Sequence, residues 1–413
     1  MIQRQGCSVP SAVLPNSVPQ VLVQREYASS FSGDPELELL LACCAHDQTR
    51  ERVQYALRSA VDWERVARLA EHHGVIAQVY TAVARVDGVL LSEMLPVRQR
   101  YDRSIHQALW LTRELLRILE HLEDCGIGAL PYKGPVLAQI LYGNVTSRQF
   151  ADLDLLVRPD DLPKIKDALA ELGYEASLRL SPPEERAYVA EGYEWVFDLG
   201  EQRNLLEIQW RILPRFYAID FDVERFFKRA VTIELCGRSV RTLCSEDLIL
   251  VLCVHAAKHA WTQLSWMREI GELSQSRALD MGAVCKEAGR LGICRIVAVG
   301  FLLANSLFGV EIQKAVQEYV QRDVAVENIV HRVLTLLSQG KEFDPESVRY
   351  FRLMMDVRER CQDRARFLSR LALTPSLGEW SAISLPGWLF PMYRVVRFLR
   401  LLRRAAVGSR VSD

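Results

Sequence analysis

Residues 130–157 constrain the fold more than any other part of the sequence, because a pair of carboxylates stands there in an apolar strand pattern. Asp152 and Asp154 are separated by one leucine and followed by L-L-V. Successive side chains of a strand point to opposite faces, so the two acids are expected to share one face. At a separation of roughly 7 Å, the carboxylates repel each other unless a divalent cation lies between them. The alternative is a solvated edge strand whose acids face water.

The elements expected before the two acids predict an anion site beside them. Gly126 indicates the end of a helix, residues 129–132 a short strand, and Lys133-Gly134-Pro135 a turn that opens an amphipathic helix through Tyr142. Proline suits the first turn of a helix, and the free amide groups and positive dipole end of that turn favour an anion. The order of strand, glycine turn, helix and D-x-D strand therefore predicts a site for phosphate and metal.

This segment resembles the family of uncharacterised nucleotidyltransferases, within the DNA polymerase β-like nucleotidyltransferase superfamily. The family pattern reads L-K-G-x-x-L, then L-Y, then R-x-x-x-D-x-D-x-L-V. The matching positions are Tyr132-Lys133-Gly134, Leu137, Leu141-Tyr142, Arg148 and Asp152-Leu153-Asp154-Leu155-Leu156-Val157. The resemblance implies an α+β fold, with a small mixed-sheet nucleotidyltransferase core flanked by N- and C-terminal helical regions.

The resemblance also implies three carboxylates that are both catalytic and metal-binding: Asp152, Asp154 and a third from a later strand. Residues 193–199 and 205–212 alternate as strands on either side of a turn. Glu207, in L-L-E-I-Q-W-R, matches the family's acid, although Gln209 replaces the histidine that usually follows it. Asp198 and Glu194 are the alternative third acids if the strand register differs.

A second match lies in the helical region that begins at Ser245, the expected N-cap of a helix with acids in its first turn. The family pattern H-x-x-K-H-x-W, then W-x-x-D, is met by His255, Lys258, His259, Trp261 and Trp266, with Glu269 replacing the aspartate. By this resemblance, basic side chains of the region bind a triphosphate. Contacts to the nucleotide are therefore expected from Lys133, Gly134, Arg148, Lys258, His255 and His259.

Two other interpretations of the histidines stay open. The first is an internal helix in which His255, His259 and the tryptophans pack on one another and on the core. The second is a zinc site, because histidines four residues apart share one helical face. The metalloprotease pattern, however, needs a glutamate where Ala256 stands, and no third ligand is near in sequence.

Composition and patterning predict five regions in the 413 residues. Residues 1–32 are expected to be a flexible leader, 33–125 a helical region, 126–244 the catalytic core, 245–385 a second helical region and 386–413 a basic amphipathic tail. The tail has five arginines at helical spacing: Arg394, Arg397, Arg400, Arg403 and Arg404. It is expected either to dock on the core with a solvated arginine face or to contact a partner, RNA or an anionic lipid surface.

Composition also limits location and partners. A formal net charge of −1 provides no overall basic field for nucleic acid or membrane. The apolar stretch 296–310 is short and contains Asn305 and Ser306, so a buried helix is expected and an integral membrane segment is not. The ten cysteines form no C-x-x-C pair, and no signal peptide is indicated. A cytoplasmic location is expected.

The predicted function is a two-metal transfer of a nucleoside monophosphate from an NTP, with ATP as the expected donor and Mg²⁺ or Mn²⁺ as the cofactor. Pyrophosphate would be released. The acceptor would carry a hydroxyl or amine, and no motif says whether it is a small molecule, a protein or RNA. The alternative is a non-catalytic nucleotide-binding or interaction protein that serves a biosynthetic or toxin–antitoxin partner, although three acids are more than a binder needs.

Overall fold

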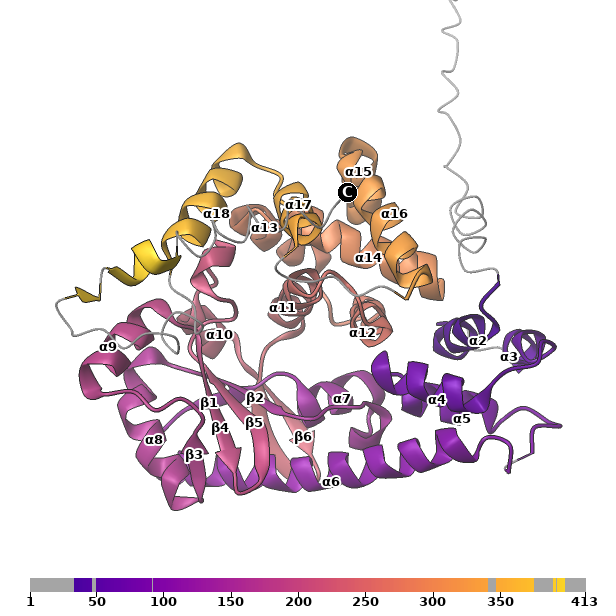
Figure 1. Ribbon diagram of the computed structural model, residues 1–413, viewed down its shortest axis with the longest axis horizontal. Coiled ribbons are helices and arrows are strands. Elements are labelled where there is room, and N and C mark those ends of the chain that lie inside the picture. The colour runs from indigo at the N-terminus through magenta and orange to yellow at the C-terminus, as the bar shows by residue number, and fades with distance from the viewer. Residues whose placement is uncertain are drawn as a thin grey trace, which may run out of the picture.

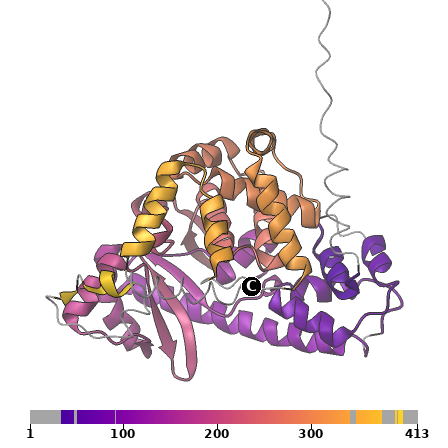
Figure 2. The ribbon, with the colours of Figure 1, turned by 45° about the horizontal axis from the view of Figure 1, so that its top comes forward.

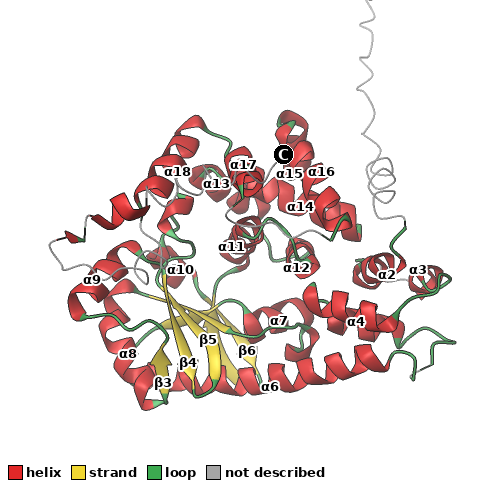
Figure 3. Cartoon of the chain, viewed as in Figure 1, coloured by secondary structure: helices red, strands yellow, loops and turns green. Residues whose placement is uncertain are grey.

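A computed structural model describes residues 33–46, 50–90, 92–340, 347–374, 389–390 and 392–397. The expected leader at 1–32 lies outside these residues, as do Arg400, Arg403 and Arg404 of the expected tail. The described chain forms a mixed sheet with helices packed around it (Figures 1 and 3). This arrangement confirms the predicted α+β class.

Five described helices precede the sheet: α2 (Pro35–Cys44), α3 (Arg50–Ala56), α4 (Trp63–His72), α5 (Ile76–Val83) and α6 (Leu95–Asp124). Asp34 and Asp62 cap α2 and α4, because their carboxylates accept hydrogen bonds from backbone N–H groups of the first turn. Helix α6 has 30 residues and is therefore about 45 Å long. It runs along the sheet and beyond it, beneath α7 and α4 in Figure 1.

The main sheet has the strand order β1-β2-β5-β4-β3. Its strands are β1 (Ala129–Pro131), β2 (Leu153–Val157), β3 (Tyr174–Ala176), β4 (Glu194–Leu199) and β5 (Gln202–Gln209). Only β2 and β5 pair in parallel, and the other neighbours are antiparallel. In the parallel register Asp154 lies opposite Glu207, so both acids project from the same face of the sheet.

Helices and a hairpin connect and follow these strands: α7 (Gly134–Tyr142), η2 (Val145–Ser147), η3 (Pro159–Asp161), α8 (Leu162–Glu171), α9 (Pro182–Glu191), η4 (Arg215–Tyr217), α10 (Val223–Arg229), β6 (Val231–Leu235) and β7 (Arg238–Thr242). The pair β6 and β7 is a hairpin that forms a separate two-stranded sheet. Strand β3 was not predicted, because three residues are too few to show alternation. Strand β5 begins and ends three residues before the predicted strand 205–212.

The helices after the hairpin are α11 (Ser245–Lys258), α12 (Leu264–Ser274), α13 (Met281–Leu291), α14 (Cys294–Phe308), α15 (Lys314–Arg322), α16 (Ala325–Ser338), α17 (Val348–Asp356) and α18 (Cys361–Leu373). The predicted Ser245 cap is wrong: Cys244 occupies the cap position, and Ser245 is the first helical residue. Cys244 also bonds through Sγ to Asp247 Oδ2 at 3.2 Å, which orients the first turn.

The chain reverses between α11 and α12, within the helical region that the sequence predicted from Ser245. Ala260 and Trp261 both have a φ of 53°, in the left-handed region. Their N–H groups bond to the carbonyls of Ala257 and Ala256, which is the hydrogen-bond pattern of a Schellman motif. This conformation costs a non-glycine residue roughly 1 kcal/mol or more. Burial of the whole Trp261 side chain offsets that cost. The reversal brings α12 back against α11.

Two hydrophobic clusters hold the molecule together. The first contains buried residues of α2, α4 and α5 together with those of α11, α12, α14 and α16, so the helices before and after the sheet share one core. The second lies between the sheet, α8 and the C-terminal half of α6. Figure 2 shows the C-terminal helices in orange on one side of the sheet and α6 in violet on the other. Helix α6 belongs to both clusters, through Val97 and Leu111 respectively.

The described part of the tail docks on the chain. Residues 392–397 are helical, Tyr393 is fully buried in the second cluster, and Arg394 lies 3.4 Å from Glu191 Oε1 of α9. Helix α14 is buried in the first cluster, as expected for residues 296–310. Across the described ranges, we find no helix with the length and apolar character needed to cross a membrane. The nine cysteines in those ranges are all free thiols, and four of them are buried.

Candidate active site

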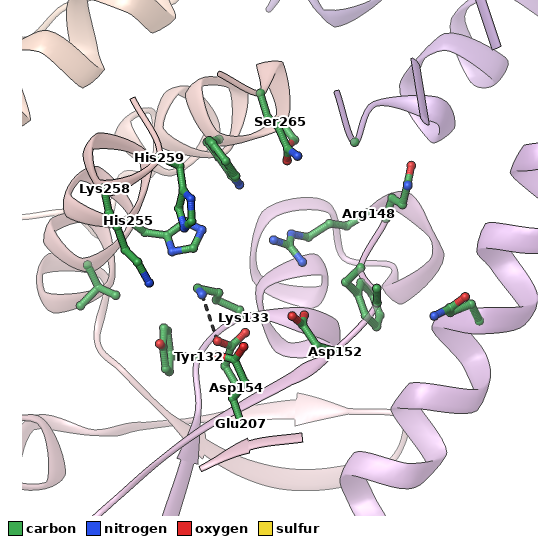
Figure 4. Close-up of a pocket in the computed structure, with 18 of the residues that line it drawn as sticks. Tyr132, Lys133, Arg148, Asp152, Asp154, Glu207, His255, Lys258, His259 and Ser265 are labelled. Atoms are coloured by element: carbon green, nitrogen blue, oxygen red, sulfur yellow. Dashed lines mark hydrogen bonds and ion pairs between the residues drawn. The ribbon is translucent and has the colours of Figure 1, made fainter. Parts of the chain in front are cut away.

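A cavity of about 590 Å³ lies between the sheet and the pair α11 and α12. Eight of the nine predicted site residues line it: Lys133, Arg148, Asp152, Asp154, Glu207, His255, Lys258 and His259. Figure 4 shows that His255 and Lys258 of α11, and His259 at its C-cap, lie over Asp154 and Glu207. The fold thus gathers three segments that are far apart in sequence, and only Gly134 stands outside the lining.

Gly134 contributes through its backbone. Its φ of +53° lies in the left-handed region, which glycine adopts without strain. A Cβ at this position would lie 3.6 Å from the carbonyl oxygen of Asp152, an ordinary contact, so the constraint is conformational rather than steric. The glycine lets the chain turn from β1 directly into α7, beside the residues that enter β2. Lys133, at the N-cap position of α7, consequently faces the acids.

A short hydrogen-bond network orders the acid cluster. Asp154 Oδ1 accepts hydrogen bonds from Lys133 Nζ at 3.0 Å and from Gln209 Nε2 at 3.2 Å. The same Gln209 nitrogen donates to Glu207 Oε2 at 2.8 Å. The Tyr132 hydroxyl donates to Gln209 Oε1, which fixes the orientation of the amide. Gln209, the residue that departs from the family's histidine, therefore holds two of the three acids.

The negative charge of the acid cluster exceeds the positive charge that Lys133 supplies beside it. Burial, followed by the charge of Asp154, raises the pKa of Asp152 to about 6. Burial, then Asp154 and Glu194, raise the pKa of Glu207 to about 7. Burial lowers the pKa of Lys133, but the charges of Asp154 and Glu207 more than compensate, so its net shift is upward. Lys133 stays charged, and the cluster still favours additional positive charge.

The donor chemistry fits a hard divalent cation. Three carboxylates supply the oxygen ligands that Mg²⁺ and Mn²⁺ prefer, and a cation would offset the burial and the repulsion by Asp154 that raise the pKa values of Asp152 and Glu207. As they stand, no three His, Cys, Asp or Glu side chains in the described ranges form a group that could hold a metal ion. Lys133 instead lies against Asp154. Holding an ion therefore requires the three acids to draw together.

Arg148 is held by Glu269, which stands where the family has aspartate. Arg148 Nε lies 2.7 Å from Glu269 Oε1, and the two side chains are only 11% and 2% exposed. The partners are 121 residues apart in sequence, in the segment before β2 and in α12. The ion pair thus joins the two sequence motifs. It also fixes the Arg148 side chain, four residues before Asp152.

The α11 residues present one cation and two neutral rings to the cavity. Burial, followed by the nearby charge of Lys133, lowers the pKa of His255 well below its ordinary value. Burial, then Lys258, lower the pKa of His259 to about 3. Both imidazoles are consequently uncharged at neutral pH, which leaves Lys258 as the basic side chain of this motif. Burial also lowers the pKa of Lys258, whose Nζ lies 5.3 Å from the centre of the Tyr193 ring.

The two imidazoles pack as an aromatic cluster with Trp266. The ring centres of His255 and His259 are 4.8 Å apart, and Trp266 lies 5.4 Å and 5.1 Å from them. The rings pack on one another, but they line the cavity and His259 is exposed, so the cluster is not enclosed in the core. No third His, Cys, Asp or Glu completes a metal-binding group with them in the part of the chain that the structure describes.

The structure separates the candidates for the third acid. Glu207 lies opposite Asp154 on the neighbouring parallel strand. Glu194 also lines the cavity, one strand further from β2, and is paired in register with Gln209. Asp198 is buried but does not line the cavity. Glu207 is therefore the acid best placed to act together with Asp154.

Sequence reasoning did not find the contribution of α6 to the cavity. Four of its polar residues line one end of the space: Arg100, Arg103, Ser104 and Gln107. Their spacing is i, i+3, i+4 and i+7, which places them on one face of the helix. A polar stripe with this spacing was the available signal, although solvated helices commonly show the same pattern.

Comparison with known proteins gives one result. A family model described as "Uncharacterised nucleotidyltransferase" matches residues 59–309, which is more than half of the chain. A search of the curated proteins found no match, and a search of the solved structures found none either. The matched span begins just before α4 and ends just after α14, and it contains all nine predicted site residues.

Proposed function

Because this chain belongs to the uncharacterised nucleotidyltransferase family, we propose that it transfers a nucleoside monophosphate from an NTP to a hydroxyl- or amine-bearing acceptor. One observation carries the proposal beyond the family. Asp152, Asp154 and Glu207 share a single cavity with the half-buried side chains of Lys133 and Lys258. Carboxylates and cations together suit a reaction in which a metal and a triphosphate must be held side by side.

The three acids would hold Mg²⁺ or Mn²⁺, which when bound supplies positive charge for the triphosphate and promotes deprotonation of the acceptor. The side chains of the protein have separate roles. Gln209 keeps Asp154 and Glu207 oriented through its bridging amide. Lys133 and Lys258 lie on the same side of Asp154 and Glu207 in Figure 4, and their ammonium groups would donate hydrogen bonds to phosphate oxygens.

The transfer balances without any further reactant. The acceptor oxygen or nitrogen attacks the α-phosphorus, and a new bond forms between these two atoms. The bond from the α-phosphorus to the oxygen that bridges it to the β-phosphorus breaks, and pyrophosphate leaves with that electron pair. The acceptor's proton passes to a carboxylate, and we assign this role to Glu207 because it stands beside Asp154 in the cavity.

The neutral aromatic cluster supports a place for the nucleoside. His255, His259 and Trp266 line the cavity as uncharged rings. Any of the four nucleobases can stack on such rings, because every base has a π-face. This contact therefore does not select the base, and ATP stays the expected donor. Lys258 lies on α11 between the two histidines, where it would reach the phosphates of the same nucleotide.

The test is transfer of label from α-³²P ATP, CTP, GTP and UTP, with Mg²⁺ or Mn²⁺, into cell extract and into the protein itself. Wild type is compared with Asp154→Asn and with Asp160→Asn, whose exposed carboxylate lies outside the cavity. Label that appears with wild type and Asp160→Asn but not with Asp154→Asn is the expected result. Binding of Mg²⁺·ATP without transfer from any nucleotide would instead favour the non-catalytic binding protein.

A further inference from the structure

The cavity continues past the acids to a second end that the mechanism above does not use. We call it the α6 end, and its walls include Arg103, Ser104 and Gln107 of α6, Gln149, and Ser265 at the start of α12. In Figure 4, Lys258 lies to one side of Asp154, and Arg148 and Asp152 lie to the other. Gln149 is the next residue after Arg148, so the α6 end adjoins the acids on the side away from Lys258.

Two polar atoms at the α6 end are buried without a hydrogen-bond partner among the described residues: Ser104 Oγ and Gln149 Oε1. The Gln149 side chain is nevertheless fixed, because its Nε2 donates to the carbonyl oxygen of Glu71 at 3.2 Å. A buried polar atom without a hydrogen-bond partner destabilises the folded state. Two such atoms beside one cavity therefore indicate a missing partner, such as a ligand. A carbonyl oxygen only accepts hydrogen bonds. The ligand that satisfies it must therefore offer an O–H or N–H donor.

The charges at the α6 end favour an anion. Arg100 lies 2.7 Å from Glu64 and 2.9 Å from Glu71, so its charge is offset. Arg103 has no acidic partner in the described ranges, and its Nε only reaches the carbonyl oxygen of Gln99 at 3.4 Å. An anionic group on the ligand would pair with this guanidinium. A cationic ligand would meet uncompensated positive charge there.

We propose that the α6 end is the acceptor subsite and that it takes a small polyhydroxylated anion, a sugar phosphate or a polyhydroxy carboxylate. The inference rests on the proposed function. Hydroxyl groups of the acceptor donate to Gln149 Oε1 and Ser104 Oγ, and its anionic group binds Arg103. A further hydroxyl attacks the α-phosphorus, its proton passes to Glu207, and pyrophosphate leaves. The new phosphodiester joins the nucleoside monophosphate to the acceptor oxygen.

Four probes of one skeleton test this assignment: glucose 6-phosphate, gluconate, glucose and glucosamine. Their binding is measured by saturation-transfer difference NMR, with the free protein and with protein loaded with Mg²⁺ and α,β-methylene ATP. The two anions are expected to bind, with glucose weaker and glucosamine weakest. The two anionic arms distinguish a phosphate from a carboxylate. The inference is overturned if neither anion binds better than glucose, or if glucosamine binds best.

Variants then locate the binding. Arg103→Gln is expected to weaken the anionic probes roughly tenfold and to leave glucose unchanged, because it removes one charge-assisted contact. Ser104→Ala and Gln149→Leu are expected to weaken all hydroxyl-bearing probes, and Ser104→Ala removes a single atom, so folding is not at risk. Arg113→Gln is the matched control, on an exposed part of α6 outside the cavity. Equal effects of Arg103→Gln and Arg113→Gln would contradict the assignment.

The same measurements separate the two proposals. If the ATP analogue does not bind, the proposed function fails, while the preferences of the free protein for the four probes still decide the subsite. If the analogue binds and the anionic probes show no preference for wild type over Arg103→Gln, the subsite fails and the nucleotidyltransferase proposal stands.

Discussion

Replacing Asp152 by asparagine should make the metal-free protein more stable at pH 8. The pKa of this carboxyl is about 6 in the folded chain and 3.8 for an ordinary aspartate, because burial and the charge of Asp154 disfavour ionisation. The difference corresponds to about 3 kcal/mol of free energy of unfolding. Asparagine has nearly the same shape and no charge, so the variant should recover most of this amount.

The direction with pH follows from the same values. A carboxyl whose pKa is raised by folding binds its proton more tightly in the folded state, so its favourable contribution is complete below pH 3.8. The contribution is lost as the pH rises through about 6, and Glu207 adds a similar loss through about 7. The stability gained with Asp152→Asn should therefore be roughly 1.5 kcal/mol at pH 5, which lies between the two pKa values, and approach about 3 kcal/mol at pH 8.

Urea unfolding in EDTA at pH 5 and pH 8 measures the effect for wild type, Asp152→Asn and the control Asp160→Asn. The control should change stability by no more than about 0.5 kcal/mol at either pH, because Asp160 is exposed. Asp152→Asn should also abolish label transfer, so stability and activity would move in opposite directions. A variant that is less stable than wild type at pH 8, or equally stabilised at both pH values, would refute the electrostatic reasoning.

Three further predictions concern groups around the acids. Gln209→Leu should lower the initial rate of label transfer about 10- to 100-fold, because the bridge between Asp154 and Glu207 is lost. Gln209→His keeps a ring N–H donor, so this variant should retain most of the wild-type rate. Glu269→Gln should cost about 3 to 5 kcal/mol in urea unfolding, because Arg148 is left buried without its partner. Lys258→Met should weaken binding of ATP about 10- to 100-fold in calorimetry, because a charge-assisted contact disappears.

Each of these has its own control and contradicting result. For Gln209, equal rates for the leucine and histidine variants would show that the bridge has no role. For Glu269, the double variant Arg148→Met/Glu269→Leu should regain much of the lost stability, and a single change that costs less than about 1 kcal/mol would contradict a buried pair. For Lys258, the exposed Lys286→Met serves as control, and equal ATP affinities of the two variants would exclude a phosphate contact.

The elements that carry the acids could be predicted because their signals are local. The Lys133-Gly134-Pro135 turn leads into α7 at Gly134, as expected from residues adjacent in sequence. The D-x-D motif also leads into the predicted strand, but β2 begins at Leu153, so Asp152 lies just before the strand and not within it. The exact start of α11 was predicted wrongly. Ser245 is a residue type that favours the cap position, but the helix begins at Ser245 itself, and Cys244 takes the cap position.

The contacts that shape the site are long-range, and local patterns carry little information about them. Arg148 and Glu269 stood out as motif residues, but nothing in their spacing indicated that they pair. Tyr132 follows β1 and Gln209 ends β5, and their hydrogen bond depends on the sheet order β1-β2-β5, which no local pattern specifies. The positive φ at Ala260 and Trp261 depends on a buried pocket for the indole, so it could not be seen in a helical pattern.

The shared core of the helices before and after the sheet has a consequence for how substrates are received. Enzymes with two separately packed halves often assemble their active site by closing a hinge, and part of the binding energy is then spent on that motion. Here α4 and α5 pack in one cluster with α11 and α12, so the walls that carry Arg148, Glu269 and Lys258 are fixed to each other in advance. Such preorganisation of the walls confines the rearrangement on binding to the three acids, which still have to draw together around a cation, and to the two substrates themselves.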